Sequence, residues 1–184
     1  MRKDIYIIGH GRHGKDTVGD MLEELGFKTC ASSWFMAEKV VFPALKDKYG
    51  YDSVHDCFND RHAHRAEWFD LIGEANPTGV ELSAGIFKEH DVYIGIRSRR
   101  ELDAVKSDPS FNPFVVWVDA SDRLPPEDIG SMELTVEDAD YFLNNNGSIE
   151  KLKSDVYTLA MTLWFDLICI CERKIKEAVR NDIK

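Results

Sequence analysis

Residues 5–17 read IYIIGHGRHGKDT, a short apolar run that breaks into a glycine-rich GxxxxGK loop. Apolar residues at helical spacing follow the lysine, which predicts an amphipathic helix ending at Gly26. Glycines allow the backbone of such a loop to turn its N–H groups inward, and the following helix directs the positive end of its dipole at the same point. The succession of strand, loop and helix therefore predicts a site for the phosphates of a nucleotide.

The residues after Gly14 indicate which class of phosphate-binding loop this is. Lys15 can reach the β- and γ-phosphates, but Asp16 stands where Ser or Thr usually binds magnesium, and the hydroxyl follows at Thr17. Lys-Asp-Thr resembles phage deoxynucleotide kinases, and many nucleoside monophosphate kinases carry Lys-Gly-Thr there. The resemblance implies that Thr17 contacts the α- and β-phosphates, with magnesium held largely through water and by Asp16. The residues expected to bind ATP or its metal here are Gly9, Gly11, Arg12, His13, Gly14, Lys15, Asp16 and Thr17, with Asp16 and Thr17 nearest the Mg²⁺.

Composition points to a compact cytoplasmic enzyme. We expect the 184 residues to form one domain, because a chain of this length can bury a sizeable core. The 33 acidic and 23 basic side chains give a net charge of −10, which argues against a general affinity for nucleic acid or an anionic membrane. Residues 1–4 lead into the first strand without an apolar signal segment, so we expect a cytoplasmic protein, in the host cytoplasm if phage-encoded. The four cysteines show neither a CxxC pair nor zinc spacing, which favours free thiols.

Strand and helix patterns alternate along the chain. Five apolar runs predict strands at residues 5–8, 27–30, 91–96, 114–118 and 141–143. Apolar strands separated by helices indicate a parallel sheet with helices on both faces, and such sheets bind ligands at the carboxyl ends of their strands. We therefore predict an α/β fold with its functional residues directly after the strands.

Four stretches together resemble the small phage-type deoxynucleoside monophosphate kinases: the loop and residues 94–102, 115–120 and 139–148. The last stretch is also similar to dephospho-coenzyme A kinase. The resemblance implies a P-loop NTPase fold in which ATP enters at the first loop. It assigns a helical acceptor-binding insertion to residues 31–89 and a short lid-like segment to residues 119–139. The apolar pattern after residue 148 predicts a C-terminal helix over residues 148–180.

Residues after the second and third strands are candidates for the acceptor site. Arg97 and Arg99 follow the third strand, where the resembled families bind the acceptor's phosphate, and guanidinium groups contact phosphate in a bidentate way. The alternative is a solvated charge cluster, of which Arg100 is expected to be part. After the second strand, Trp34 could stack on a base while Ser33 binds a sugar or phosphate.

Three further arginines are candidate phosphate ligands. Arg61 and Arg65 stand at i and i+4, which would place both on one helix face and within reach of one anionic group. The alternative is a surface face with Trp68 and Phe69 in the core. Arg123 is the one basic residue among seven carboxylates of the lid-like segment, so we expect it to act on the transferring phosphate or to form a structural ion pair.

The last part of the chain has two candidate roles. Asn145 follows the fifth strand, where the resembled kinases place amides near the ATP base, although Asn also suits a turn. Ser148 is expected to cap the final helix. That helix is apolar nearly all round but is interrupted by Asp166, which excludes a membrane span and leaves either a homodimer contact or an internal core.

Three functions follow. The leading hypothesis is a phosphotransferase that uses ATP and Mg²⁺ to convert a free deoxynucleoside monophosphate into the diphosphate, with catalytic charge from Lys15, Arg97 and Arg123. The second is a kinase of 5-hydroxymethyl-deoxyuridine in phage DNA. Its hydroxyl acceptor would benefit from a general base, for which Asp16 is the expected residue. The third is a nucleotide-binding module without transfer activity.

Overall fold

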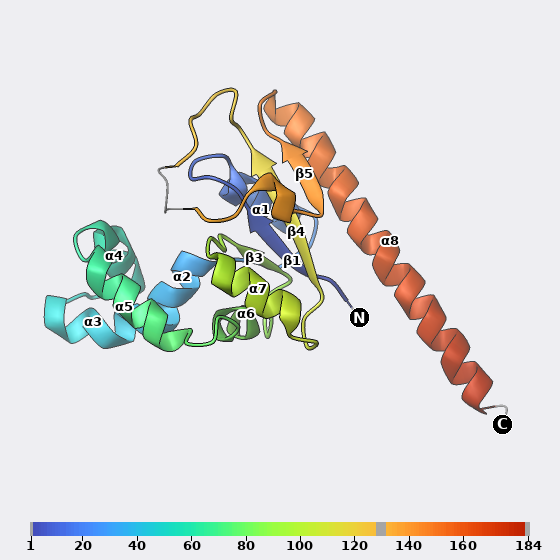
Figure 1. The fold of residues 1–184 in the computed structure, drawn as a ribbon, viewed down its shortest axis with the longest axis horizontal. Coiled ribbons are helices and arrows are strands. Elements are labelled where there is room, and N and C mark those ends of the chain that lie inside the picture. The colour runs from blue at the N-terminus through green and yellow to red at the C-terminus, as the bar shows by residue number, and fades with distance from the viewer. Residues whose placement is uncertain (1, 128–131, 183–184) are drawn as a thin grey trace.

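Five parallel strands form one sheet in the order β2-β3-β1-β4-β5 (Figure 1). They are β1 (Asp4–Ile8), β2 (Thr29–Ala31), β3 (Val92–Ile94), β4 (Pro113–Asp119) and β5 (Tyr141–Asn144). The computed structural model describes residues 2–127 and 132–182, and the side chains of the last helix as far as residue 165. The five expected strands and the α/β fold are confirmed.

The first strand lies at the centre of the sheet. Ile7 of β1 is in register with Ile94 of β3 on one side and with Val116 of β4 on the other. The strand order reverses direction at β1, so the loop after β1 opens at a switch point on the carboxyl edge of the sheet. Ligands of open α/β sheets bind at such points.

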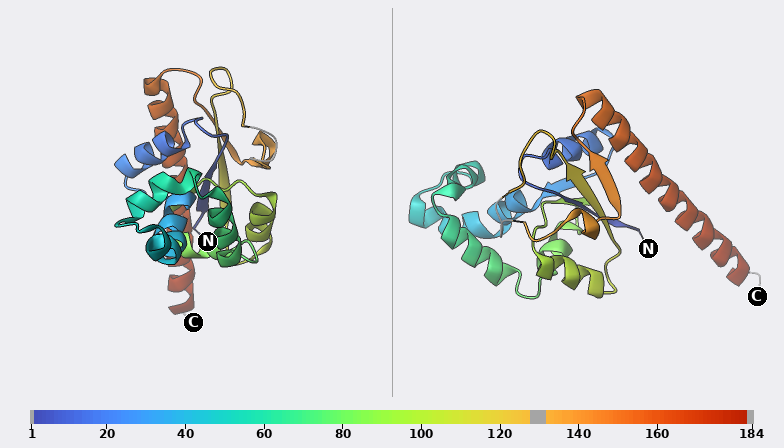
Figure 2. Two further views of the ribbon diagram at one scale, coloured as in Figure 1. Left: turned by 90° about the vertical axis from the view of Figure 1, so that its left-hand side faces the viewer. Right: turned by 45° about the horizontal axis from the view of Figure 1, so that its top comes forward.

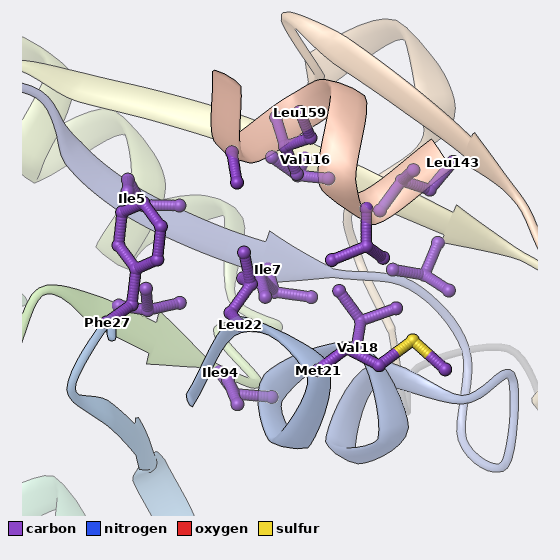
Figure 3. Packing of buried hydrophobic residues seen from close by; sticks show 14 of the residues in the cluster. Ile5, Ile7, Val18, Met21, Leu22, Phe27, Ile94, Val116, Leu143 and Leu159 are labelled. Atoms are coloured by element: carbon purple, nitrogen blue, oxygen red, sulfur yellow. The ribbon is translucent and has the colours of Figure 1, made fainter. Parts of the chain in front are cut away.

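Alternate residues of β1 face the two layers of helices, as the pleat of a strand requires. Ile5 and Ile7 pack against α1 (Lys15–Glu24) and α8 (Ile149–Asp182), as Figure 3 shows for Val18, Leu22 and Leu159. On the other face, a second core cluster contains residues of β1, α2 (Ser32–Met36), α6 (Glu81–Ile86) and α7 (Arg99–Ser107). The loop is therefore set on a strand that is buried on both faces.

The insertion between β2 and β3 is helical, as expected, and extends to one side of the sheet (Figure 2). A π-helix over Ala37–Val41 continues α2 into α3 (Phe42–Tyr49), and α4 (Val54–Asn59), a 3₁₀ turn (Asp60–His62) and α5 (Arg65–Ala75) follow. These helices enclose a core of their own, made of Ala37, Val41, Leu45, Cys57 and Trp68.

Two expectations for the insertion were wrong. Trp68 is buried, but its neighbour Phe69 is 77% exposed, because successive helical residues point in different directions and only one side of α5 meets this core. Arg61 and Arg65 do not share a helix, since Arg61 lies in the 3₁₀ turn and Arg65 begins α5. The chain leaves helical geometry at His64, whose ring stacks on Tyr49 with 3.8 Å between centroids.

The final helix begins directly after Ser148 and runs well past the sheet (Figure 1). Three large apolar side chains at four-residue spacing, Tyr157, Met161 and Phe165, are exposed along it. The homodimer contact through this helix stays a prediction. No helix within the described residues has the length and apolarity needed to cross a membrane.

Candidate nucleotide-binding site

The glycine-rich loop has the backbone geometry that its glycines permit. Gly9 leaves β1 with φ +138°, and a Cβ at this position would collide with the carbonyl oxygen of Val118 on β4. Gly14 precedes α1 in the left-handed region with φ +95°, where side chains other than glycine are strained. Arg12 lies at the exposed tip and also has a positive φ, of 65°. The loop is thus shaped by close contact with the neighbouring strand as well as by its own sequence.

Residues directly after β4 and β5 hold this loop through hydrogen bonds to His13. The backbone N–H of Ala120 donates to Nδ1 of the fully buried His13 at 3.1 Å, and the side-chain amide of Asn145 donates to the carbonyl oxygen of His13 at 2.9 Å. The backbone N–H of Asn145 in turn donates to the backbone carbonyl oxygen of Asp119 at 2.6 Å. Asn145, expected beside the ATP base, therefore has its amide N–H on the loop itself.

Lys15 is buried inside the loop. Its ammonium donates to the carbonyl oxygens of Gly9 and His10 at 2.8 and 2.7 Å. Burial, with the nearby charge of Arg97, lowers the pKa of Lys15 from 10.5 to about 8. A cation that is partly stripped of water and aimed into a loop is suited to bind phosphate oxygens.

A carboxylate from the lid-like segment already occupies this loop. Both oxygens of Glu127 accept hydrogen bonds of 2.8 Å from Arg97. A Cβ on Gly11 would lie 2.6 Å from Oε1 of Glu127, so the carboxylate fills the space that the glycine leaves free. We call the loop backbone at Gly11, Lys15 and Arg97 the anion cradle.

Further contacts hold Glu127 in the anion cradle. Its backbone N–H donates to Nδ1 of His10 at 3.3 Å, and burial lowers the pKa of His10, which keeps that nitrogen free to accept. Burial of the Glu127 carboxyl raises its pKa, but Arg97 and Gly11 outweigh this effect and hold the pKa below its usual value. Sequence reasoning missed Glu127, because nothing in the sequence distinguishes it from the other carboxylates of the segment. The contact shows that the cradle accommodates a carboxylate.

Of the arginines after β3, Arg97 is the one that faces the loop. The guanidinium of Arg99 instead forms a bidentate pair with Asp138, and its backbone N–H donates to Glu133 at 2.7 Å. Arg100 donates to the backbone carbonyl oxygens of Asn76 and Pro77. Arg99 and Arg100 therefore tie neighbouring segments to the start of α7.

The other candidate arginines lie elsewhere. Arg123 is exposed and donates through Nε to the carbonyl oxygen of Asn145 at 3.1 Å, which places it beside the turn after β5. Arg61 donates to the carbonyl oxygen of Phe58 at 2.7 Å and covers the Phe58 ring, and Arg65 is exposed at the start of α5. The structure brings Lys15 and Arg97 together, but it does not bring Arg61 and Arg65 together.

A cavity of about 380 Å³ lies at the edge of the sheet beside β2. Trp34 contributes to its wall and packs against His55 and Phe58, whereas Ser33 is exposed. The residues that line the cavity are Thr29, Cys30, Ala31, Trp34, Phe35, Glu38, Lys39, Glu89 and His90. Its lining includes no residue of the glycine-rich loop or the anion cradle, and Glu89 and His90 precede β3.

Metal binding here would depend on the nucleotide. Among the described side chains, no three His, Cys, Asp or Glu residues cluster as a metal site. Asp16 is exposed and Thr17 half-buried in the first turn of α1, directly after Lys15. This donor set fits Mg²⁺, which keeps several waters and takes other ligands from phosphate oxygens.

The sheet order and the loop together define an α/β P-loop NTPase fold. No protein-family model and no curated protein matches the sequence. Three solved structures to which the chain is similar are TT1252 from Thermus thermophilus, a gluconokinase from Sinorhizobium meliloti 1021 and shikimate kinase from Bacteroides thetaiotaomicron. TT1252 is 17% identical with a TM-score of 0.48, and the match covers 88% of this chain and 98% of TT1252. The gluconokinase is 17% identical with a TM-score of 0.41, and the match covers 90% of this chain and 99% of the gluconokinase. The shikimate kinase is 13% identical with a TM-score of 0.46, and the match covers 86% of this chain and 97% of the shikimate kinase. The fold assignment rests on this chain's own sheet and loop.

Proposed function

We propose that this protein transfers the γ-phosphoryl group of ATP to a deoxynucleoside monophosphate. The observation that carries the proposal is the anion cradle, in which a P-loop lysine that follows β1 and Arg97, which follows β3, act on the charge of one carboxylate. Phosphoryl transfer asks the protein mainly to align two anionic groups and to neutralise their charge. A lysine that follows β1 and an arginine that follows β3 are placed for the donor and the acceptor sides of such a reaction.

The residues would divide the work as follows. The loop N–H groups and Lys15 bind the β- and γ-phosphates, and Arg97 draws the acceptor phosphate toward the γ-phosphate. Mg²⁺ would be held by phosphate oxygens and water beside Asp16 and Thr17, where it neutralises charge on the transferring group. The acceptor phosphate is already ionised at neutral pH, so its attack requires no general base.

A free nucleotide is the favoured acceptor because of the charge of the protein. A net charge of −10 opposes a polyanion such as DNA. The homodimer contact of α8 is part of the proposal but does not enter the chemistry.

A kinase of 5-hydroxymethyl-deoxyuridine in DNA is the second candidate, and one observation favours it. A hydroxyl acceptor benefits from a carboxylate base, and Glu127 supplies a carboxylate at the loop in addition to the exposed Asp16.

A phosphate-transfer screen separates the candidates. Purified protein, ATP and Mg²⁺ are incubated with each deoxynucleoside monophosphate, with hydroxymethylated DNA and with unmodified DNA, and Lys15→Ala is the matched control. We expect transfer to at least one monophosphate and its loss in Lys15→Ala, because this variant lacks the cation inside the loop. Transfer to hydroxymethylated DNA alone would select the second candidate. Tight ATP binding without transfer to any acceptor would indicate a nucleotide-binding module.

A further inference from the structure

Glu127 stands where an anionic ligand of the loop would have to lie. Its carboxylate lies against the loop backbone at Gly11, sits within the field of Lys15 and accepts two 2.8 Å hydrogen bonds from Arg97. These are the groups on which the proposed function depends for phosphate binding. Two anions cannot share them, because both would need the same donors and would repel each other at contact distance.

We propose that the Glu127 carboxylate acts as a built-in competitor of the nucleotide phosphates, so that the protein restrains its own nucleotide binding by filling the anion cradle. This inference rests on the proposed function, and it names a regulation of the same site. When a triphosphate enters the loop, the Glu127 carboxylate must leave it, and the Arg97 guanidinium can then contact the acceptor phosphate in place of Glu127. Binding of ATP and separation of Arg97 from Glu127 then occur together.

The same contact balances charge at the loop. The buried Lys15 and the part-exposed Arg97 repel each other. An internal carboxylate offsets this repulsion and keeps both groups near the positions in which they bind phosphate. Glu127 therefore preserves the shape of the site at the expense of its affinity.

The size of the effect follows from the exposure of the pair. The Arg97 and Glu127 side chains are 42% and 23% exposed, so water screens their attraction in part. A half-screened pair of this kind favours the occupied cradle about five-fold, and the apparent dissociation constant of a competing ligand rises by about the same factor.

The test compares nucleotide binding to the full chain and to charge variants of the lid-like segment. Glu127→Gln removes the competing charge and keeps the side chain's shape. Glu137→Gln removes one charge from an exposed position of the same segment and is the matched control. Calorimetry measures the binding of ATP and of inorganic triphosphate, each with Mg²⁺ and with a chelator, while thermal melts confirm that each variant is folded. Glu127→Ala serves as a second variant if glutamine itself holds the cradle.

We expect Glu127→Gln to bind both ligands about five-fold more tightly with and without Mg²⁺, and Glu137→Gln to match the parent protein. Unchanged or weaker binding in both Glu127 variants would refute the competition. Weaker binding only with Mg²⁺ would refute it by making Glu127 a metal ligand, and loss of transfer with unchanged binding would refute it by making Glu127 a general base. If the parent binds ATP through Lys15 and transfers phosphate while the variants bind no better, this inference fails and the proposed function stands. If neither the parent nor any Glu127 variant binds ATP, both fail.

Discussion

Raising the pH from 7 to 9 should weaken ATP binding, because the loop lysine loses its proton in this interval. Burial lowers the pKa of Lys15 from 10.5 to about 8 in the free protein. Lys15 is then protonated to about nine-tenths at pH 7 and to about one-tenth at pH 9, and the affinity of a ligand that requires the ammonium falls about nine-fold. Bound phosphates favour the ammonium form and raise this pKa, so binding at pH 9 should take up close to one proton.

Calorimetry in two buffers of different ionisation enthalpy measures both quantities at each pH. Burial holds the pKa of His10 below its usual value, so His10 does not change its charge in this interval. Lys15→Arg is the matched control, because a guanidinium keeps its charge over the whole interval. Equal affinity at pH 7 and pH 9 without proton uptake would show that Lys15 is not desolvated or does not bind the phosphates, and the reasoning would be refuted.

Three further predictions concern the loop and the arginines. Gly9→Ala should lower the free energy of unfolding by about 3 kcal/mol, because it combines a strained backbone with a collision at Val118. Gly73→Ala on α5 meets open space and should raise the free energy of unfolding by about 0.5 to 1 kcal/mol. Urea denaturation measures both variants, and equal stabilities would contradict the loop geometry. Arg97→Ala should raise the acceptor KM and lower kcat without weakening ATP binding, since the same change frees Glu127 from its anchor; a parallel loss of ATP affinity would move Arg97 to the donor site. Arg99→Ala should lower the thermal unfolding midpoint through loss of the Asp138 pair and leave the acceptor KM unchanged, and a raised KM would return Arg99 to the acceptor site.

The sheet and the loop could be predicted because their signals are local. An apolar run such as residues 5–8 has few alternatives to a buried strand, and the glycines after it specify a backbone path within a few residues. The burial of Lys15 inside the loop could be expected from its place in the GxxxxGK motif alone. Trp68 was among the residues considered for the core, and the structure buries it.

The remaining site residues depend on contacts between distant segments. The helix between Arg61 and Arg65 is broken by His64 stacking on Tyr49, which no local pattern specifies. Glu127 reaches Arg97 across 30 positions, and six other carboxylates of its segment were equally acceptable partners in the sequence. Arg99 was predicted to bind phosphate, but in the structure it forms an ion pair with Asp138, which lies 39 positions away in the sequence.

The contacts beneath the loop determine when the site can assemble during synthesis. His13 is held by Ala120, 107 positions later, and by Asn145, 132 positions later. β1 itself pairs only with strands that follow it by more than 80 residues. A nascent chain that has not yet released β5 from the ribosome therefore carries the complete GxxxxGK sequence without the support that shapes it. Closing such long segments is slow, so we expect the loop to reach its final shape among the last steps of folding.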